Sequence, residues 1–221
     1  LASNATSFGT GANASGVDSQ ALGYFANARS TRGVAIGPYA NVQGIDSLAL
    51  GQNATTTGNQ DLAIGTNSIA EGPYASAIGY QANSYGSQSM ALGVNSIAVG
   101  VNALAVGHGA QANGNNAFAI GVNAVADGDE SFVMGDGSQV KAGSRDAFVT
   151  GDDASATGND SSAFGYKSVA VGSNAYATGT MSRSLGANAH AIGTQAYATM
   201  PNTLAYGTFA TARSNNSLAL G

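Results

Sequence analysis

The chain has 221 residues, no cysteine, only 9% charged residues and a formal net charge of −5. An acidic balance without a cluster of Lys and Arg argues against a nucleic-acid-binding protein, and the lack of cysteine excludes disulfides and thiolate metal sites. No apolar stretch approaches the roughly 20 residues that a membrane-spanning helix needs. We therefore expect no nucleic-acid partner and no direct insertion of this segment into a membrane.

Glycines recur every fourteen residues along nearly the whole chain. One series runs from Gly9 to Gly135 and a second from Gly151 to Gly221, with a single step of sixteen residues between them. We number each repeat from this glycine as position 0. Position −2 is then almost always Ala, position −1 is large and apolar, position +3 is Ala or Ser, and position +7 is usually a second glycine. Regularity of this kind predicts a repeat protein.

A repeat of fourteen residues is too short for helical solenoids or leucine-rich repeats, whose units have 20 residues or more. It suits two short strands of about five residues and two turns, with the glycines at positions 0 and +7 supplying positive φ in those turns. Successive units then stack as parallel strands. The sequence predicts one all-β domain over residues 1–221, a parallel β-roll of about fifteen coils with two short strands per coil.

The first strand of each coil, positions −4 to −1, has little that is polar on either face. Examples are SLAL at 47–50 and AFAI at 117–120. A strand that is apolar on both faces is expected to be buried on both faces. One face can pack inside the coil, and the chain has no helix to cover the other. We expect another copy of the chain to cover it, with closed symmetry; the periodicity leaves two-fold and three-fold symmetry open.

The repeat motif S-x-A-[ILV]-G-x-x-[AS]-x-A-x-G resembles the head-domain repeat of YadA-like trimeric autotransporter adhesins. It stands as SLALGQNATTTG at 47–58, SMALGVNSIAVG at 89–100 and SVAVG at 168–172, and the resemblance covers essentially the whole chain. It implies a homotrimeric, left-handed β-roll on the surface of Gram-negative bacteria. It also implies a neck, a coiled-coil stalk and a C-terminal β-barrel anchor in the outer membrane, which we expect to lie outside this segment.

The resemblance implies an adhesive head that binds extracellular-matrix proteins, host cells or abiotic surfaces. Two alternatives belong to other classes. One is a passive spacer or a self-association rod that acts in autoaggregation and biofilm. The other is an ice-binding solenoid, which needs a regular threonine ladder where this chain has only the single run Thr55–Thr57.

Catalytic and metal-binding motifs are not supported. The glycine run GTGANASG at 9–16 lacks the Lys of a phosphate-binding loop and opens no predicted helix. His108 and His190 occupy different repeat positions nearly six coils apart, and the aspartate ladder of calcium-binding β-rolls is missing. We expect no enzyme activity, no cofactor and no metal site.

The second strand, positions +3 to +6, alternates small residues inward and polar residues outward. Position +4 therefore points outward, and in five repeats it is apolar. We hypothesise that these side chains contribute to an adhesive surface; alternatively they only favour strand formation. They are Ile69, Ile97, Val125, Val169 and Tyr197.

The sixteen-residue step places two extra residues in the turn at 141–146, KAGSRD, which carries Lys141 and Arg145. This turn is either a loop that contacts the ligand or a tolerated surface insertion. Residues 127–160 hold eight of the twelve acidic residues, and Asp136 and Asp152 share position +1 in adjacent coils. That segment is either a weak cation site or a solvated face.

Aromatic residues gather at positions +1 and +2, where they either form an adhesive surface or pack against a neighbouring subunit. They are Tyr24, Phe25, Tyr39, Tyr80, Tyr166 and Phe209. Position −3 carries Phe118, Phe132 and Phe148 in three successive coils, which predicts a stacked ladder in the core or at a subunit interface.

Overall fold

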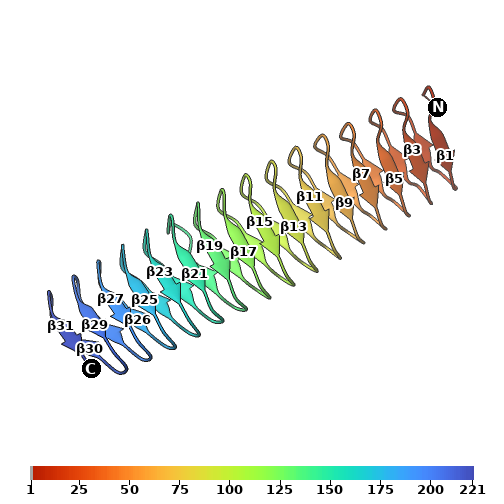
Figure 1. The fold of residues 1–221 in the computed structure, drawn as a ribbon. Coiled ribbons are helices and arrows are strands. Elements are labelled where there is room, and N and C mark those ends of the chain that lie inside the picture. Colours follow the sequence, from red (N-terminus) through yellow and green to blue (C-terminus); the bar gives the residue numbers. More distant parts are fainter. Residues whose placement is uncertain (1) are drawn as a thin grey trace. The chain divides into compact units, whose positions relative to one another are not determined.

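The structure, a computed structural model, describes residues 2–221 and consists of strands and turns. The chain divides into two compact units, the first ending at Gly109 and the second running from Ala110 to Gly221. Within each unit the chain winds into stacked coils, each with one strand of three residues and one of two (Figure 1). The described part of the chain contains no helix long and apolar enough to cross a membrane.

In the first unit the three-residue strands form one row and the two-residue strands form another. The three-residue strands are β1 (Thr6–Phe8), β3 (Gln20–Leu22), β5 (Val34–Ile36), β7 (Leu48–Leu50), β9 (Leu62–Ile64), β11 (Ser76–Ile78), β13 (Met90–Leu92) and β15 (Leu104–Val106). The two-residue strands are β2 (Asn13–Ala14), β4 (Asn27–Ala28), β6 (Asn41–Val42), β8 (Thr55–Thr56), β10 (Ile69–Ala70), β12 (Asn83–Ser84) and β14 (Ile97–Ala98).

The second unit repeats this arrangement. Its three-residue strands are β17 (Phe118–Ile120), β19 (Phe132–Met134), β21 (Phe148–Thr150), β23 (Ser162–Phe164), β25 (Tyr176–Thr178), β27 (His190–Ile192), β29 (Leu204–Tyr206) and β31 (Leu218–Leu220). Its two-residue strands are β16 (Gln111–Ala112), β18 (Val125–Ala126), β20 (Gln139–Val140), β22 (Ser155–Ala156), β24 (Val169–Ala170), β26 (Arg183–Ser184), β28 (Tyr197–Ala198) and β30 (Thr211–Ala212).

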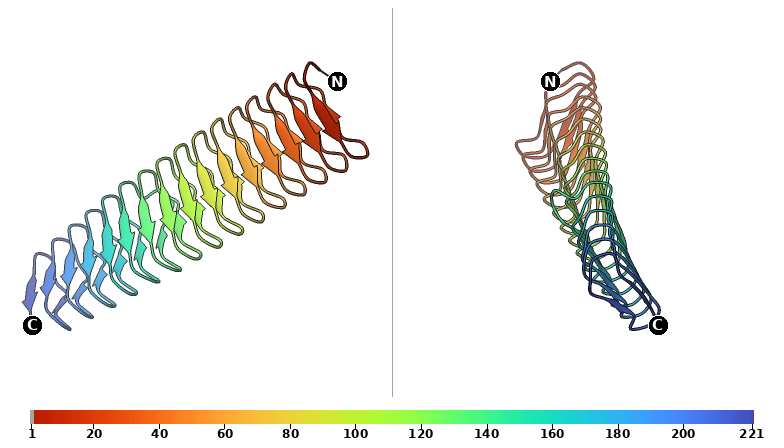
Figure 2. Two further views of the ribbon diagram at one scale, coloured as in Figure 1. Left: turned by 45° about the vertical axis from the view of Figure 1, so that its right-hand side comes forward. Right: turned by 90° about the vertical axis from the view of Figure 1, so that its left-hand side faces the viewer.

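Neighbouring strands in each row are parallel and are shifted by one repeat. Ile69 pairs with Asn83, and Asn83 pairs with Ile97. Where the repeat has sixteen residues the pairing follows it, so that Phe132 pairs with Phe148. Figure 2 shows each coil as a flattened loop with a short strand in its long sides. The predicted parallel β-solenoid is confirmed.

The strands are shorter than the five residues expected because turns take up most of each coil. The turns of the fourteen-residue repeats each contain a residue in the left-handed region, at position +2 or +9; Asn53 has φ 56° and Asn188 has φ 53°. Asn, Asp and Gly tolerate this conformation better than other residues do. Asn is accordingly common at both positions. The residues that allow the chain to turn are therefore those at +2 and +9 as well as the glycines.

The glycines at positions 0 and +7 are required for different reasons. Gly93, at position 0, has φ 139°, and a Cβ on it would lie 2.5 Å from the carbonyl oxygen of Gly107 in the next coil. Gly86, at position +7, has no positive φ, but a Cβ there would collide with the Gly100 carbonyl oxygen. The expectation of positive φ at +7 was wrong, because the close approach of the next coil selects glycine there.

The core between the two strands of a coil is built almost entirely of alanine. Ala63, Ala70 and Ala77 are fully buried, and valine is the largest side chain among the fully buried residues. Many buried serines are satisfied locally, as when the Ser89 hydroxyl donates to the Gly86 carbonyl oxygen at 2.7 Å, although the hydroxyls of Ser144, Ser168 and Ser182 have no partner among the described residues. The two strands lie so close that a methyl or hydroxymethyl group fills the space between them.

The three-residue strands expose an apolar face on the outside of the coil. Position −2 points into the core, whereas positions −3 and −1 point outward; Leu50 and Met90, for example, remain 39% and 41% exposed. The strand is therefore apolar on both faces, as the sequence predicts, and within a single chain the outer face is only partly covered. A strip of this kind is unusual on a soluble monomer.

The predicted phenylalanine ladder lies on this outer face, in the second unit. Of the two locations expected from the sequence, the core is therefore ruled out. The ring centroids of Phe118 and Phe132 are 6.2 Å apart, and those of Phe132 and Phe148 are 4.7 Å apart and nearly parallel. The ladder continues beyond the three residues predicted from the sequence, through Phe164, Tyr176 and His190.

The two reasons for glycine can be separated by substitution. We expect Gly86→Ala to lower the melting temperature through the steric clash alone. Gly143→Ala tests conformation alone, because Gly143 has φ 84° and open space around it; we expect a loss of about 1 kcal/mol. Gly93→Val combines both effects and should destabilise the protein most. If Gly86→Ala melted like the wild type, the clash would not be what selects glycine at position +7.

Candidate functional site

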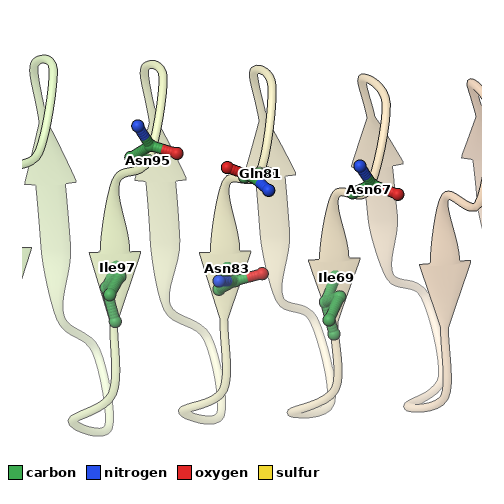
Figure 3. Close-up of a pocket in the computed structure, with 6 residues that line it drawn as sticks. All are labelled: Asn67, Ile69, Gln81, Asn83, Asn95 and Ile97. Atoms are coloured by element: carbon green, nitrogen blue, oxygen red, sulfur yellow. The ribbon is translucent and has the colours of Figure 1, made fainter.

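A shallow groove of about 340 Å³ follows the outward face of the two-residue strands in the first unit (Figure 3). Two rows of side chains line it. The row on the strands, at position +4, is Ile69 on β10, Asn83 on β12 and Ile97 on β14; the row at the adjoining turns, at position +2, is Asn67, Gln81 and Asn95.

The repeat explains why these two rows share a face. Position +3 is a small inward residue, so positions +2 and +4 both point outward. The position +2 residues have left-handed backbones, with φ of 58° at Asn67 and 55° at Gln81. The stacking of coils at about 4.8 Å then turns each position into a row. The groove presents amide groups along its wall and alternating apolar and amide groups along its floor.

Asn83 has no amide neighbour along its own row. In the row at position +2, by contrast, asparagines of successive coils hydrogen bond to each other, as when Asn53 Nδ2 donates to Asn67 Oδ1 at 3.1 Å. Asn83 is flanked on both sides by isoleucine, and no described residue donates a hydrogen bond to its Oδ1. The fold therefore leaves this amide oxygen buried beneath the groove floor without a partner.

The structure brings together only Ile69 and Ile97 of the residues predicted to bind a ligand. Val125, Val169 and Tyr197 also lie half-buried at position +4, facing outward, but in the second unit. Each has polar neighbours in its row, and Val125 pairs with Gln111 and Gln139. Val125 between two glutamines repeats the alternation of Ile and Asn in the first unit.

The amides at position +2 were not predicted from the sequence. Asn67, Gln81 and Asn95 stand at turn positions, where such residues are expected for conformational reasons alone. The sequence did contain a sign that these amides lie beside the position +4 residues. Positions +2 and +4 are two residues apart with a buried residue between them, and such residues share a face.

Lys141 and Arg145 are exposed and lie outside this groove. The two extra residues of the long repeat form a turn at 142–143. Arg145 keeps the usual turn contacts, since its N–H donates to Asn159 Oδ1 at 3.0 Å and its carbonyl oxygen accepts from the Asp160 N–H at 2.9 Å. The insertion therefore projects from one turn while the stacking beside it is maintained.

Several acidic residues of the segment 127–160 bind backbone amides of the preceding coil. Asp136 Oδ1 accepts the N–H of Val122 at 2.8 Å, and Asp152 Oδ1 accepts the N–H of Asp136 at 3.1 Å. Among residues 2–221, no three His, Asp or Glu side chains gather as ligands for a metal ion. These carboxylates have a structural role that a count of charges does not reveal.

Of the six aromatic residues at positions +1 and +2, Tyr24, Phe25 and Tyr39 form one cluster of rings. Tyr166 instead lies beside the Lys167 ammonium group, which is 4.9 Å from its ring centroid. Tyr80 and Phe209 are exposed in other coils.

Asp61 is a carboxylic acid inside the alanine core. It is 2% exposed, at a position where other repeats place Ser47 or Ser89. Its Oδ1 accepts the Ala75 N–H at 3.0 Å, whereas no described residue donates a hydrogen bond to Oδ2. Burial raises the pKa of Asp61 to about 6, although the hydrogen bond from the Ala75 N–H acts in the opposite direction. At neutral pH the fold therefore holds a buried, partly unpaired charge.

A sequence profile of the family described as YadA head domain repeat matches most of the chain. The matched segments are 2–19, 14–40, 43–68, 70–96, 98–124, 112–138, 150–175, 165–189 and 198–221. The crystal structure of the collagen-binding domain of the Yersinia adhesin YadA is similar at 21% identity with a TM-score of 0.33, covering 81% of this chain and 68% of that one. No curated protein matches the sequence.

We expect the stability of this protein to depend on pH through Asp61. The native pKa of about 6 exceeds the ordinary 3.8, so the native state binds the proton more tightly and the free energy of unfolding rises as pH falls from about 7 to 4. The full difference corresponds to roughly 3 kcal/mol. Thermal melts at pH 4.5 and 7.5 measure it.

Asp61→Ser is the matched variant, because serine occupies this position in other coils. We expect it to melt at a higher temperature than the wild type at pH 7.5. We also expect its melting temperature to rise much less than that of the wild type when the pH is lowered. Parallel melting curves of the two proteins across this pH range would show that Asp61 is not the group responsible.

Proposed function

The chain belongs to the family of YadA head domain repeats, and from that premise we propose that it is the adhesive head of a protein exposed on the surface of a Gram-negative bacterium. In this proposal the chain is anchored to the outer membrane through other parts of the protein. The observation that carries the adhesive role is the groove, where apolar and amide side chains alternate on a face that the coil does not cover.

We propose that the chain assembles as a homotrimer through the outer face of its three-residue strands. The support is the apolar strip at positions −3 and −1, which includes Leu50, Met90 and Leu92 and stays partly exposed in one chain. Burying such surface stabilises association by about 25 cal/mol per Å² before the costs of association are subtracted. The position +4 face points away from this strip and stays free for a ligand.

The groove spacing favours an extended matrix protein such as collagen as the ligand. Ile69 and Ile97 are two coils apart, or about 9.6 Å. A polyproline II chain repeats one face every three residues, or about 9.3 Å. Apolar side chains of such a chain can therefore contact both isoleucines while its peptide groups face Asn83. Each contact is weak, and repetition along the coils and around a trimer supplies avidity.

Sedimentation equilibrium tests the assembly. A trimer of 21.6 kDa chains has a mass of about 65 kDa. A stable monomer that keeps its far-ultraviolet circular dichroism spectrum would contradict the role assigned to the apolar strip.

The adhesive role is tested by binding to immobilised collagen, fibronectin, laminin and bare plastic. We expect binding to collagen, and we expect Ile69→Thr with Ile97→Thr to weaken it at least about tenfold. These substitutions keep β-branching and remove apolar surface. Val99→Thr with Val171→Thr is the control, because both valines are exposed but lie outside the groove.

If the folded wild-type trimer bound none of these surfaces, a spacer or self-association rod would be the better description. If the groove variant bound collagen as tightly as the control does, adhesion would lie elsewhere on the molecule.

A further inference from the structure

A cluster of three aromatic rings lies on the surface of the first unit, at the turns that follow β3 and β5. The Tyr24 ring meets Phe25 and Tyr39 edge to face, with centroids 4.6 and 5.4 Å away. Phe25 and Tyr39 are parallel to within 4°, with centroids 6.0 Å apart. The three side chains remain 47%, 49% and 49% exposed, so each ring offers surface to a partner.

Two of these rings occupy positions where they strain the backbone. Phe25 has φ 51° and Tyr39 has φ 59°, at the left-handed position +2 that Asn53 and Asn67 hold in later coils. Bulky residues are rare in this region, and such conformations cost of order 1–3 kcal/mol. Because the rings stay half exposed, burial within the chain offsets little of that cost. The repeat imposes this conformation at position +2 whatever residue stands there, as at Met181 and Phe209, so what Phe25 and Tyr39 add is exposed aromatic surface at these turns.

The repeat places this cluster over a row of amides. Positions +2 and +4 share one face, as they do in the groove of Figure 3. Phe25 and Tyr39 therefore stand beside Asn27 and Asn41 of β4 and β6, at the positions that Gln81 and Asn83 hold relative to each other. Near the N-terminal end the wall is aromatic and the floor is amide.

The amides in this floor are only loosely engaged. Asn27 Nδ2 donates to Asn41 Oδ1 at 3.4 Å, and Asn13 Nδ2 donates to Asn27 Oδ1 at 3.3 Å, which are long hydrogen bonds. In the orientation that satisfies both of its polar atoms, the Asn27 amide oxygen accepts from Arg29 Nε at 2.8 Å and from Arg29 Nη2 at 3.0 Å. The long bonds between neighbouring asparagines are therefore the ones that ligand hydroxyl groups can replace.

We propose that Tyr24, Phe25, Tyr39, Asn27 and Asn41 form a binding site for a neutral oligosaccharide. The C–H face of a pyranose ring packs on an aromatic face, and its hydroxyl groups both donate to and accept from amide side chains. This site lies in other coils than the collagen groove and does not depend on it.

The chemistry of the site disfavours other occupants. A purely apolar partner, including the apolar strip of a second copy, would bury the asparagine amides without hydrogen bonds, at considerable cost. A proline-rich peptide offers acceptors but few N–H donors. A strongly anionic ligand would find beside the cluster one cation without a carboxylate partner, Arg29, because the Arg32 guanidinium already pairs with Asp46.

The test uses the whole chain and three probes, N-acetyllactosamine, chitotriose and 3′-sialyllactose, with saturation-transfer NMR and calorimetry. We expect binding of at least one neutral probe. Phe25→Asn with Tyr39→Asn should reduce its affinity at least tenfold. The same variant should melt at an equal or higher temperature, because asparagine suits the left-handed backbone. Phe209→Asn is the matched control, since Phe209 has φ 62° and is 66% exposed at the same repeat position; it should bind like the wild type.

Three results would overturn the proposal. They are no binding of either neutral probe at millimolar concentration, binding of the sialylated probe alone, and a double variant that loses stability or dissociates into monomers. The last result would make the cluster a subunit contact. Collagen binding by the same variant, which we expect to be unchanged, distinguishes failure of this site from failure of the groove.

Discussion

The backbone hydrogen bonds between one coil and the next determine most other features of this protein. Each coil lies directly on its neighbour, as when the Ile69 N–H donates to the Ala82 carbonyl oxygen at 2.9 Å and the Asn83 N–H donates to that of Ser96 at 2.9 Å. Stacking at this distance leaves no space for a Cβ at glycines of positions 0 and +7, such as Gly93 and Gly86. It also converts each position of the repeat into a row of identical environments along the unit.

Because every position forms a row, the two outer faces differ in character throughout each unit. The outer face of the three-residue strands is apolar, with aliphatic side chains in many coils and an aromatic ladder from Phe118 to His190. The face of the two-residue strands mixes amide, hydroxyl and aliphatic groups, as Ile69 and Asn83 illustrate. The apolar face is suited to permanent burial, and the mixed face is suited to reversible contact with water and ligands. In the proposed function, assembly and adhesion therefore use different faces of the coil.

The fold could be predicted from the sequence because a fixed period and inward alanines leave few alternatives. The roles of individual residues were harder to predict. Glycine at position +7 looks the same in sequence whether positive φ or a close neighbour selects it, and only the coordinates of Gly86 separate the two. The carboxylate of Asp136 resembles a solvated charge until the Val122 N–H is seen to donate to it. The amide wall of the groove was missed because turn residues such as Gln81 have a conformational reason to be there.

The two extra residues at 142–143 show where this scaffold tolerates variation. On either side of them the strands keep their pairing, with Gln139 opposite Ser155 and Phe132 opposite Phe148. A segment can thus enter between Lys141 and Ser144 while the rows on both sides remain in register. The junction after position +6 is accordingly an insertion site, where loops of other lengths or grafted peptides can be displayed without disturbing the stacked strands.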